Sequence, residues 1–208
     1  MLNRTKYFRK LCLSGCFFVG MISLSSSANA QFIGINADYA IDYSAAPGKV
    51  SGYSVGIAHP APFIPNIGYS SVSFEDKETI TVTPNTVSLV TTTTIKTINL
   101  FYNVPFPVVT ITVGFGYGAD NLNTGVETIT TIKENDVGKD NSESKDSVSE
   151  AFFHIGLPFW NTVEFHLGYH FMSFSSIDIT KSVTLAGNYT TDKNYSGGMT
   201  TIGVQVAF

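Results

Sequence analysis

The clearest pattern in the chain is an alternation with a period of two over residues 163–172. The odd positions are apolar and the even positions are mostly polar or small: Val163, Phe165, Leu167, Tyr169 and Phe171 alternate with Glu164, His166, Gly168, His170 and Met172. Alternation over this length predicts a β-strand with one apolar face. Residues 151–157 alternate in the same way, and the short link LPFWNT joins the two segments into a predicted β-hairpin. The segment 163–172 has the roughly 9–11 residues that a tilted membrane-crossing strand needs.

The same alternation recurs in six other segments, which brings the predicted number of strands to eight. These segments lie near residues 32–42, 52–58, 67–75, 97–104, 109–118 and 200–208. The third of them is irregular, because Ile67 and Tyr69 follow one phase of the alternation whereas Val72 and Phe74 follow the other. A β-bulge is therefore expected in that strand.

The predicted links between strands differ at the two ends. HPAPFIPN, NVPFPV and LPFWNT are compact and hold six of the eight prolines, whereas residues 76–94, 120–149 and 175–195 are long and polar. Short turns at one end and longer loops at the other are typical of outer-membrane barrels. An even number of strands then places both termini with the short turns, on the periplasmic side. An interfacial aromatic rim is predicted there, made of Phe63, Phe106, Phe159, Trp160 and Phe208.

Parts of the long links keep the strand pattern. Residues 79–83 and 87–91 alternate and are expected to extend their strands beyond the membrane, with a turn near Pro84 and Asn85. Residues 134–149 are charged and poor in aromatic residues, so a mobile loop is predicted there.

Alternation alone also fits a soluble β-sandwich, whose apolar faces point inward. The polar faces here are rich in glycine, at Gly34, Gly52, Gly56, Gly114, Gly116, Gly118, Gly156, Gly168 and Gly203. Glycine suits the narrow interior of an eight-stranded barrel better than a solvated surface. The chain also stops at Phe208, the end of an amphipathic strand. These features predict an all-β fold, an eight-stranded antiparallel up-and-down transmembrane β-barrel with its apolar faces outward.

Residues 1–30 have the features of a cleaved signal peptide. Four basic residues precede a largely apolar stretch, and Ala28-Asn29-Ala30 forms an A-x-A cleavage site before Gln31. The alternative is a lipobox at Leu13 to Cys16, but it would leave an apolar region far shorter than a signal needs. The barrel domain is therefore predicted to span residues 31–208.

Removal of this segment changes the chemistry that is available to the chain. Cys12, Cys16, Arg4 and Arg9 all lie within it, so the remaining chain has neither cysteine nor arginine. Because the segment holds four basic residues and no acidic one, the formal net charge falls from −4 to −8. No disulfide, thiol nucleophile or cysteine-based metal site is expected. An acidic, arginine-free product also argues against nucleic-acid binding.

The signal segment, the eight amphipathic strands and the terminal Phe208 resemble small bacterial outer-membrane β-barrels of the OmpA/OmpX/OmpW-like kind. The segments HPAPFIPNIGY and YNVPFPVVTITVGFGYG are similar to a family of small proteobacterial barrels of unassigned function. The resemblance implies that the C-terminal strand is read by the barrel-assembly machinery. The chain departs from such barrels in one respect, because it offers no arginine to pair with acidic residues inside.

Five polar residues are predicted to share the lumen, and they are Asp38, His154, Glu164, His166 and His170. His166 and His170 stand about 13 Å apart along one strand, which is too far for both to bind one metal ion. His154 can approach one of them across the hairpin. The favoured interpretation is polar filling of a tight interior, with no catalytic residue, metal or cofactor.

Two other functions were weighed for a barrel of this kind. A lipid-A-modifying enzyme needs a serine beside a histidine, but Ser173 falls on the face opposite His170. A narrow path for small apolar solutes is the other alternative, although an eight-stranded interior is just wide enough to be filled by side chains. The acidic residues of the 120–149 link form no calcium-loop motif and are interpreted as a solvated loop.

The sequence therefore predicts a non-enzymatic structural or surface-interaction protein of the Gram-negative outer membrane, which acts through its long extracellular loops. Its expected partners are outer-membrane lipid and lipopolysaccharide, together with the assembly machinery. It is expected to be a monomer.

Overall fold

The computed structural model describes residues 33–61, 63–82, 85–134, 137–160, 162–174, 177–183 and 187–208. The predicted signal segment, residues 1–30, lies outside them. The strands assigned in the described residues are β1 (Gly34–Tyr43), β2 (Val50–Ala58), β3 (Asn66–Val82), β4 (Asn85–Pro105), β5 (Thr110–Gly118), β6 (Gly125–Glu134), β7 (Val137–Asp146), β8 (Val148–Trp160), β9 (Val163–Phe174), β10 (Ile177–Val183), β11 (Gly187–Lys193) and β12 (Gly197–Ala207). A single turn of 3-10 helix (Asp120–Leu122) follows β5. No helix in the described part of the chain is long and apolar enough to cross a membrane.

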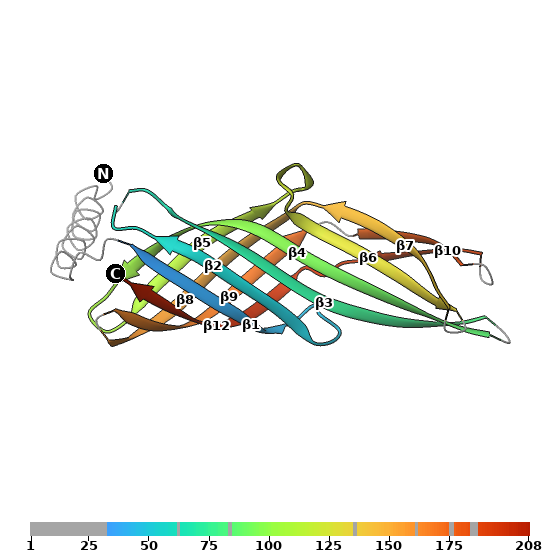
Figure 1. Cartoon of the computed structure of the whole chain (residues 1–208), viewed down its shortest axis with the longest axis horizontal. Helices are drawn as coiled ribbons and strands as arrows, with labels where there is room; N and C mark the ends of the chain where they lie inside the picture. The colour runs from blue at the N-terminus through green and yellow to red at the C-terminus, as the bar shows by residue number, and fades with distance from the viewer. Residues whose placement is uncertain are drawn as a thin grey trace, which may run out of the picture.

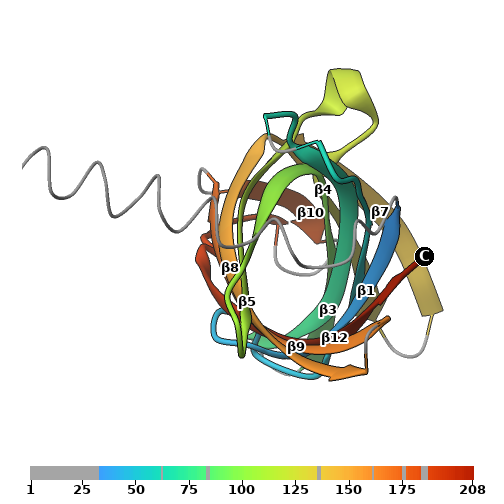
Figure 2. The ribbon, with the colours of Figure 1, turned by 90° about the vertical axis from the view of Figure 1, so that its left-hand side faces the viewer.

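Eight of the strands form a closed antiparallel ring in the order β1-β2-β3-β4-β5-β8-β9-β12. The ring closes where β12 pairs with β1, from Gly34 opposite Ala207 to Tyr43 opposite Met199. The end-on view shows the strands circling a common axis (Figure 2). Every strand lies beside the next ring strand in the chain, so the predicted eight-stranded antiparallel up-and-down barrel is confirmed.

The predicted long links are mostly β-structure. β3 and β4 pair continuously from Asn66–Phe101 out to Val82–Asn85, which confirms the extension expected there. β6 pairs with the outer half of β4, and β7 pairs with β6. The described part of residues 134–149 is therefore mostly β-strand, and the prediction of a mobile loop there is wrong. β10 and β11 form a separate hairpin. Figure 1 shows β6, β7 and β10 at the end of the barrel opposite the C-terminus.

The outward face of the ring is apolar on every strand. Phe115, Leu167 and Ile202 are 54%, 57% and 49% exposed, whereas a sandwich would bury them between two sheets. Because contiguous apolar patches on soluble monomers rarely exceed a few hundred Å², an apolar band that encircles the whole barrel is suited to a lipid environment.

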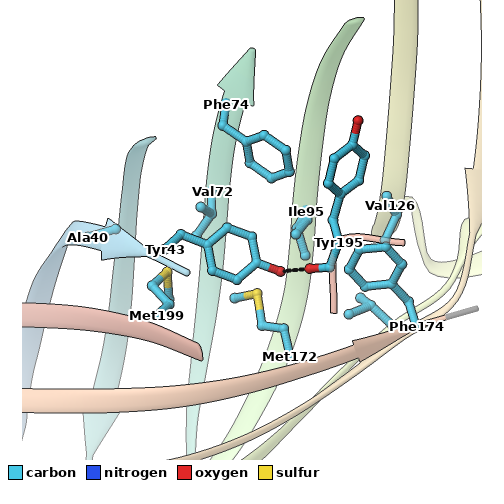
Figure 3. Packing of buried hydrophobic residues seen from close by; sticks show 11 residues of the cluster. Ala40, Tyr43, Val72, Phe74, Ile95, Val126, Met172, Phe174, Tyr195 and Met199 are labelled. Carbon is cyan, nitrogen blue, oxygen red and sulfur yellow. Dashed lines mark hydrogen bonds between the residues drawn. The ribbon is translucent and has the colours of Figure 1, made fainter. Parts of the chain in front are cut away.

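The inward face is divided into two layers. The half of the barrel beside the long hairpins holds an apolar plug, defined as Ala40, Tyr43, Val72, Phe74, Ile95, Val126, Val148, Met172, Phe174, Tyr195 and Met199. Figure 3 shows these side chains converging from several strands, with the Tyr43 hydroxyl donating a hydrogen bond to the backbone carbonyl of Tyr195. The half beside the short turns holds polar side chains, among them Asn36, Asp38, Asn99 and three histidines.

The plug explains two departures from the sequence prediction. β3 pairs with both neighbours without a shift in register, so the bulge expected in it is wrong: Val72 and Phe74 face inward because the lumen is apolar at their level. A shift instead occurs in β1 between Ala40 and Asp42. It reverses the alternation and turns Tyr43 into the plug.

Lumenal glycines leave room for large side chains on neighbouring strands. A Cβ atom at Gly114 would lie 2.7 Å from two ring carbons of Phe152, and one at Gly116 would lie 2.7 Å from the Glu150 carboxylate. Since the narrow interior has no other space for these groups, glycine at these positions permits the bulky lumenal residues.

Candidate functional site: a buried histidine–carboxylate cluster

The polar residues of the candidate site come from three strands, of which β8 and β9 are neighbours and β1 is separated from β9 by β12. β8 contributes Glu150 and His154, β9 contributes Glu164, His166 and His170, and β1 contributes Asp38 from across the ring closure; this set is called the lumenal cluster. All are inward positions of alternating strands. Apart from Glu164, whose side chain is 13% exposed, their side chains are at most 2% exposed.

Two glycines let the cluster converge. Gly203 of β12 stands between Asp38 on β1 and His166 on β9 in the strand register, and a Cβ atom there would lie 2.6 Å from the Asp38 Cγ. Gly168 lies opposite His154, where a Cβ atom would lie 2.5 Å from the imidazole Cδ2. Any larger residue at either position would push the two sides of the cluster apart.

One arm of the cluster is a hydrogen-bonded chain. The Glu150 carboxylate accepts hydrogen bonds from His170 Nδ1 and from the Thr97 hydroxyl, each at 2.5 Å. Because a carboxylate only accepts, His170 carries its proton on Nδ1 and its Nε2 is an acceptor when the ring is neutral. His154 Nε2 lies 3.1 Å from that acceptor and must donate to it. The lone pair of neutral His154 is therefore on Nδ1.

The second arm of the cluster runs from Glu164 through His166 to Asp38, and His154 of the first arm also lies near Asp38. His166 Nε2 lies 2.9 Å from the Glu164 carboxylate, although the angles of this contact are not those of a hydrogen bond. A proton on Nε2 would suit this neighbouring acceptor and would leave the lone pair of the neutral ring on Nδ1. His166 Nδ1 lies 3.7 Å, and His154 Nδ1 lies 3.9 Å, from the same oxygen of Asp38, Oδ1. Two imidazole Nδ1 atoms thus lie near one carboxylate oxygen. Both Asp38 oxygens, both of these Nδ1 atoms, His166 Nε2 and Glu164 Oε1 are buried without a hydrogen-bond partner.

The cluster carries a concentration of negative charge. Three carboxylates, those of Asp38, Glu150 and Glu164, lie inside the barrel, and no lysine is among the buried side chains of the described residues. No arginine occurs after Arg9. Burying carboxylates without a cation is costly, so compensation must come from protons on the histidines or on the carboxylates themselves, or from a bound cation.

One subset of the cluster resembles a hydrolytic triad but is sealed from solvent. His170 bonds Glu150 through Nδ1, and its Nε2 lies 3.3 Å from the Thr201 hydroxyl. A catalytic nucleophile must be reachable by its substrate, yet His170 and Thr201 are 0% and 2% exposed. Ser173, the serine weighed as a lipid-A-modifying nucleophile, is exposed on the outer face.

The structure brings together all five residues predicted to share the lumen. His154 reaches His170 across the hairpin, while His166 and His170 stand apart along β9 and meet different carboxylates. Glu150 is a lumenal residue that the sequence analysis did not predict, because it directly follows the acidic link 120–149. The alternation does indicate an inward position, since Glu150 has the same phase as Phe152 and His154.

The predicted aromatic rim residues belong to the short-turn end. Phe63, Phe159 and Phe208 are 91%, 61% and 69% exposed, and Phe159 packs edge-on against Phe165. Phe106 is half-buried, and the side chain of Trp160 lies outside the described set. Their role as an interfacial rim stays a prediction.

Comparison with known proteins gives similarity in fold only. No protein-family model matches the sequence, and no curated protein matches it. Among solved structures, Neisserial surface protein A (NspA) has 13% identity and a TM-score of 0.48, over 85% of this chain and 96% of that one. OprG of Pseudomonas aeruginosa has 10% identity and a TM-score of 0.45 over 85% and 95%. Ail, the attachment invasion locus protein of Yersinia pestis, has 8% and 0.42 over 85% and 96%.

Because each TM-score is below 0.5, the class of protein follows from the geometry itself. A closed eight-stranded antiparallel ring with an apolar outer band and a filled polar and apolar lumen is the architecture of an outer-membrane β-barrel. The chain has that fold.

Proposed function

We propose that the protein is a non-enzymatic integral barrel of a Gram-negative outer membrane, which presents an extended β-sheet at the cell surface for contact with another macromolecule. The observation that carries this proposal is the continuation of two ring strands far beyond the length needed to cross a bilayer. β3 has 17 residues and β4 has 21, whereas a tilted membrane-crossing strand needs about 9–11.

The extra length is built into a sheet of four strands. The outer parts of β3 and β4 pair with each other, β6 adds to β4 between Val87 and Lys96, and β7 adds to β6; this region is called the projecting sheet. Figure 1 shows it extending away from the barrel end that holds the C-terminus. Regular hydrogen-bonded pairing makes it a stiffer platform than a loop. A preorganised surface of this kind loses less conformational entropy when it binds a partner.

The closed lumen supports this role over transport. The inward residues form an apolar plug above a buried polar layer, and the largest of them, including Phe101, His154 and Met199, are below 2% exposed. Side chains that line a water-filled channel are wetted by it, so burial at these levels argues against an open pore. The sealed cluster likewise argues against catalysis on an external substrate.

The orientation follows from the links between strands. The short turns lie at the same end of the barrel as the start of β1 and the end of β12. In this architecture short turns face the periplasm and long loops face the exterior. The projecting sheet then faces outward from the cell.

Location and orientation can be tested on intact cells. Cells that express the protein are treated with an external protease, and the membrane fraction is examined for heat-modifiable migration on gels. We expect cleavage within residues 76–94 or 120–149 and a protected barrel. Protection of both segments, or recovery of the protein in a soluble fraction, would contradict the proposal.

The surface role can be tested by removal of the hairpin β6–β7. A variant in which residues 125–146 are replaced by a short Gly-Ser link keeps all eight ring strands. We expect normal insertion, but loss of cell autoaggregation or of adhesion to an array of immobilised glycans and proteins, whichever the parent shows. The matched control replaces residues 184–186, the link between β10 and β11. Altered lipid A in a mass spectrum, or solute flux through vesicles that hold the parent, would refute the non-enzymatic, closed assignment.

A further inference from the structure

We propose that Asp38, His154 and His166 form a binding site for a single divalent transition-metal ion of the Zn²⁺ class inside the barrel. These three residues are called the lumenal triad. This inference is independent of the projecting sheet and of the surface role proposed above.

The donor set matches the chemistry of such an ion. Two imidazole nitrogens and one carboxylate oxygen are a common protein ligand set for Zn²⁺, with water in the fourth position. Imidazole ligands also select against Mg²⁺ and Ca²⁺, which prefer oxygen donors. One ligand atom from each of the three residues lies within 4.8 Å of the other two.

The distances are close to those of a metal site. Bonds of about 2.0–2.1 Å at tetrahedral angles place ligand atoms about 3.4 Å apart. The Nδ1 atoms of His166 and His154 lie 3.7 and 3.9 Å from Asp38 Oδ1. These two separations exceed the tetrahedral value by a few tenths of an ångström, and all three ligand atoms lie within 4.8 Å of one another. Movements of about an ångström or less therefore bring the three ligand atoms to the spacing that a bound ion requires.

The hydrogen-bond network prepares both imidazoles for the metal. A metal-binding histidine almost always donates its other ring N–H to a carboxylate or another acceptor, which fixes the tautomer. His166 faces Glu164 at 2.9 Å through Nε2. His154 donates through Nε2 to His170, which in turn donates to Glu150. In both rings Nδ1 is then the atom left for a metal ion, and each Nδ1 lies at most 3.9 Å from Asp38 Oδ1.

The alternative occupant of this space is a proton shared between His166 and Asp38. A single proton satisfies one Nδ1 atom, whereas the second Nδ1 atom and the other Asp38 oxygen are also buried without partners. A divalent cation is held by both imidazoles and the carboxylate together. It also offsets more of the charge of the three lumenal carboxylates, for which the described lumen provides no lysine.

Entry is from the short-turn end of the barrel. Glu164 is the most exposed side chain of the lumenal cluster, at 13%, and it lies next to His166. A carboxylate at the mouth of the lumen concentrates cations there.

The test is metal binding by the full-length protein extracted from membranes in detergent, stripped with a chelator and returned to buffer with Co²⁺ or Zn²⁺. A second sample is refolded from urea with the metal present, so that slow entry into the folded barrel does not limit binding. We expect one equivalent of metal per chain, and a visible Co²⁺ spectrum typical of four-coordinate nitrogen and oxygen ligation.

Three variants assign the ligands. Asp38→Asn and His166→Gln are near-isosteric and should weaken binding by roughly 100-fold or more, beyond the 10–100-fold that loss of a ligand's hydrogen-bond partner costs. Glu164→Gln should fall within that smaller range. Heat-modifiable migration reports whether each variant is folded. The matched control is His59→Ala, since His59 lies in the β2–β3 link and bonds Pro65 and Ala61 locally.

The outcomes separate the alternatives. Stoichiometric binding that is lost in Asp38→Asn and His166→Gln but kept in His59→Ala supports the site. No binding by the refolded parent would show that protons alone occupy the lumenal triad. Equal binding by folded Asp38→Asn, or loss of binding in His59→Ala, would place the metal elsewhere and overturn the assignment.

Discussion

The packing of the lumen can be tested at two glycines on inward faces of the ring. Gly114 of β5 and Gly34 of β1 both face inward, but their surroundings differ. A Cβ atom at Gly114 would lie 2.7 Å from Cε1 and Cε2 of Phe152, and closer still to Cζ. A Cβ atom at Gly34 would meet Ala58, Gln205 and Val206 at ordinary distances of 3.4–3.6 Å.

The magnitude follows from what Phe152 contacts. Its ring is stacked on His170 at a centroid distance of 4.9 Å and packs against Phe101 at 6.4 Å, so the ring cannot move without displacing them. Overpacking of a tight interior costs about 1–3 kcal/mol. We expect Gly114→Ala to destabilise the barrel by that amount. Gly34→Ala should be neutral or stabilising by about 0.4–1 kcal/mol, because alanine lowers the entropy of the unfolded chain.

The assay is urea unfolding in detergent micelles or lipid vesicles. Fluorescence of Trp160, the single tryptophan of the chain, and the fraction of heat-modifiable protein on gels report the same transition. A Gly114→Ala midpoint equal to or above that of the parent would refute the inference of a tightly filled lumen. A large loss in Gly34→Ala would show that inward glycines are needed for backbone reasons rather than for space.

Three further outcomes are expected. Leu167→Lys, on the outward face and 57% exposed in the parent, should cost about 2–4 kcal/mol if it lies near the bilayer midplane, seen as poorer folding into vesicles; no loss would contradict a lipid-facing band. Glu150→Ala should cost about 1–3 kcal/mol, because it leaves the buried His170 N–H and Thr97 hydroxyl without their acceptor, and the urea midpoint measures it; an unchanged midpoint would refute a stabilising role for these hydrogen bonds. Burial, followed by the hydrogen bond to Asp76, raises the pKa of Tyr195. An unfolded tyrosine ionises near pH 10, so the stability that comes from keeping the Tyr195 hydroxyl neutral is complete below pH 10 and is lost as pH rises above it. Equal alkaline unfolding profiles for Tyr195→Phe and the parent would exclude this contribution.

Local pattern was sufficient for the strands and their faces. A strand alternates its side chains whatever it packs against, so the phase of Phe115, Leu167 and Phe101 could be read from neighbouring residues alone. Lumenal glycines were recognisable for the same reason, since they share that phase and a narrow barrel excludes larger residues.

Local pattern failed where the environment of the lumen changes along its axis. Val72 and Phe74 follow the inward phase of β3, but apolar residues in that phase predict a bulge if the whole lumen is polar. The shift in β1 that turns Tyr43 inward leaves no mark in the alternation of apolar residues. Only the plug that Tyr43 enters explains it.

The sequence by itself determined the class of fold and most of the residues that would enter the lumen, because alternation depends on near neighbours in the chain. Only the tertiary structure decided which of those residues meet. Asp38 reaches His154 and His166 because β1 pairs with β12 and so closes the ring, and Gly203 leaves space between them. These contacts join the two ends of the chain, and their geometry depends on ring closure and strand stagger, which no local pattern encodes.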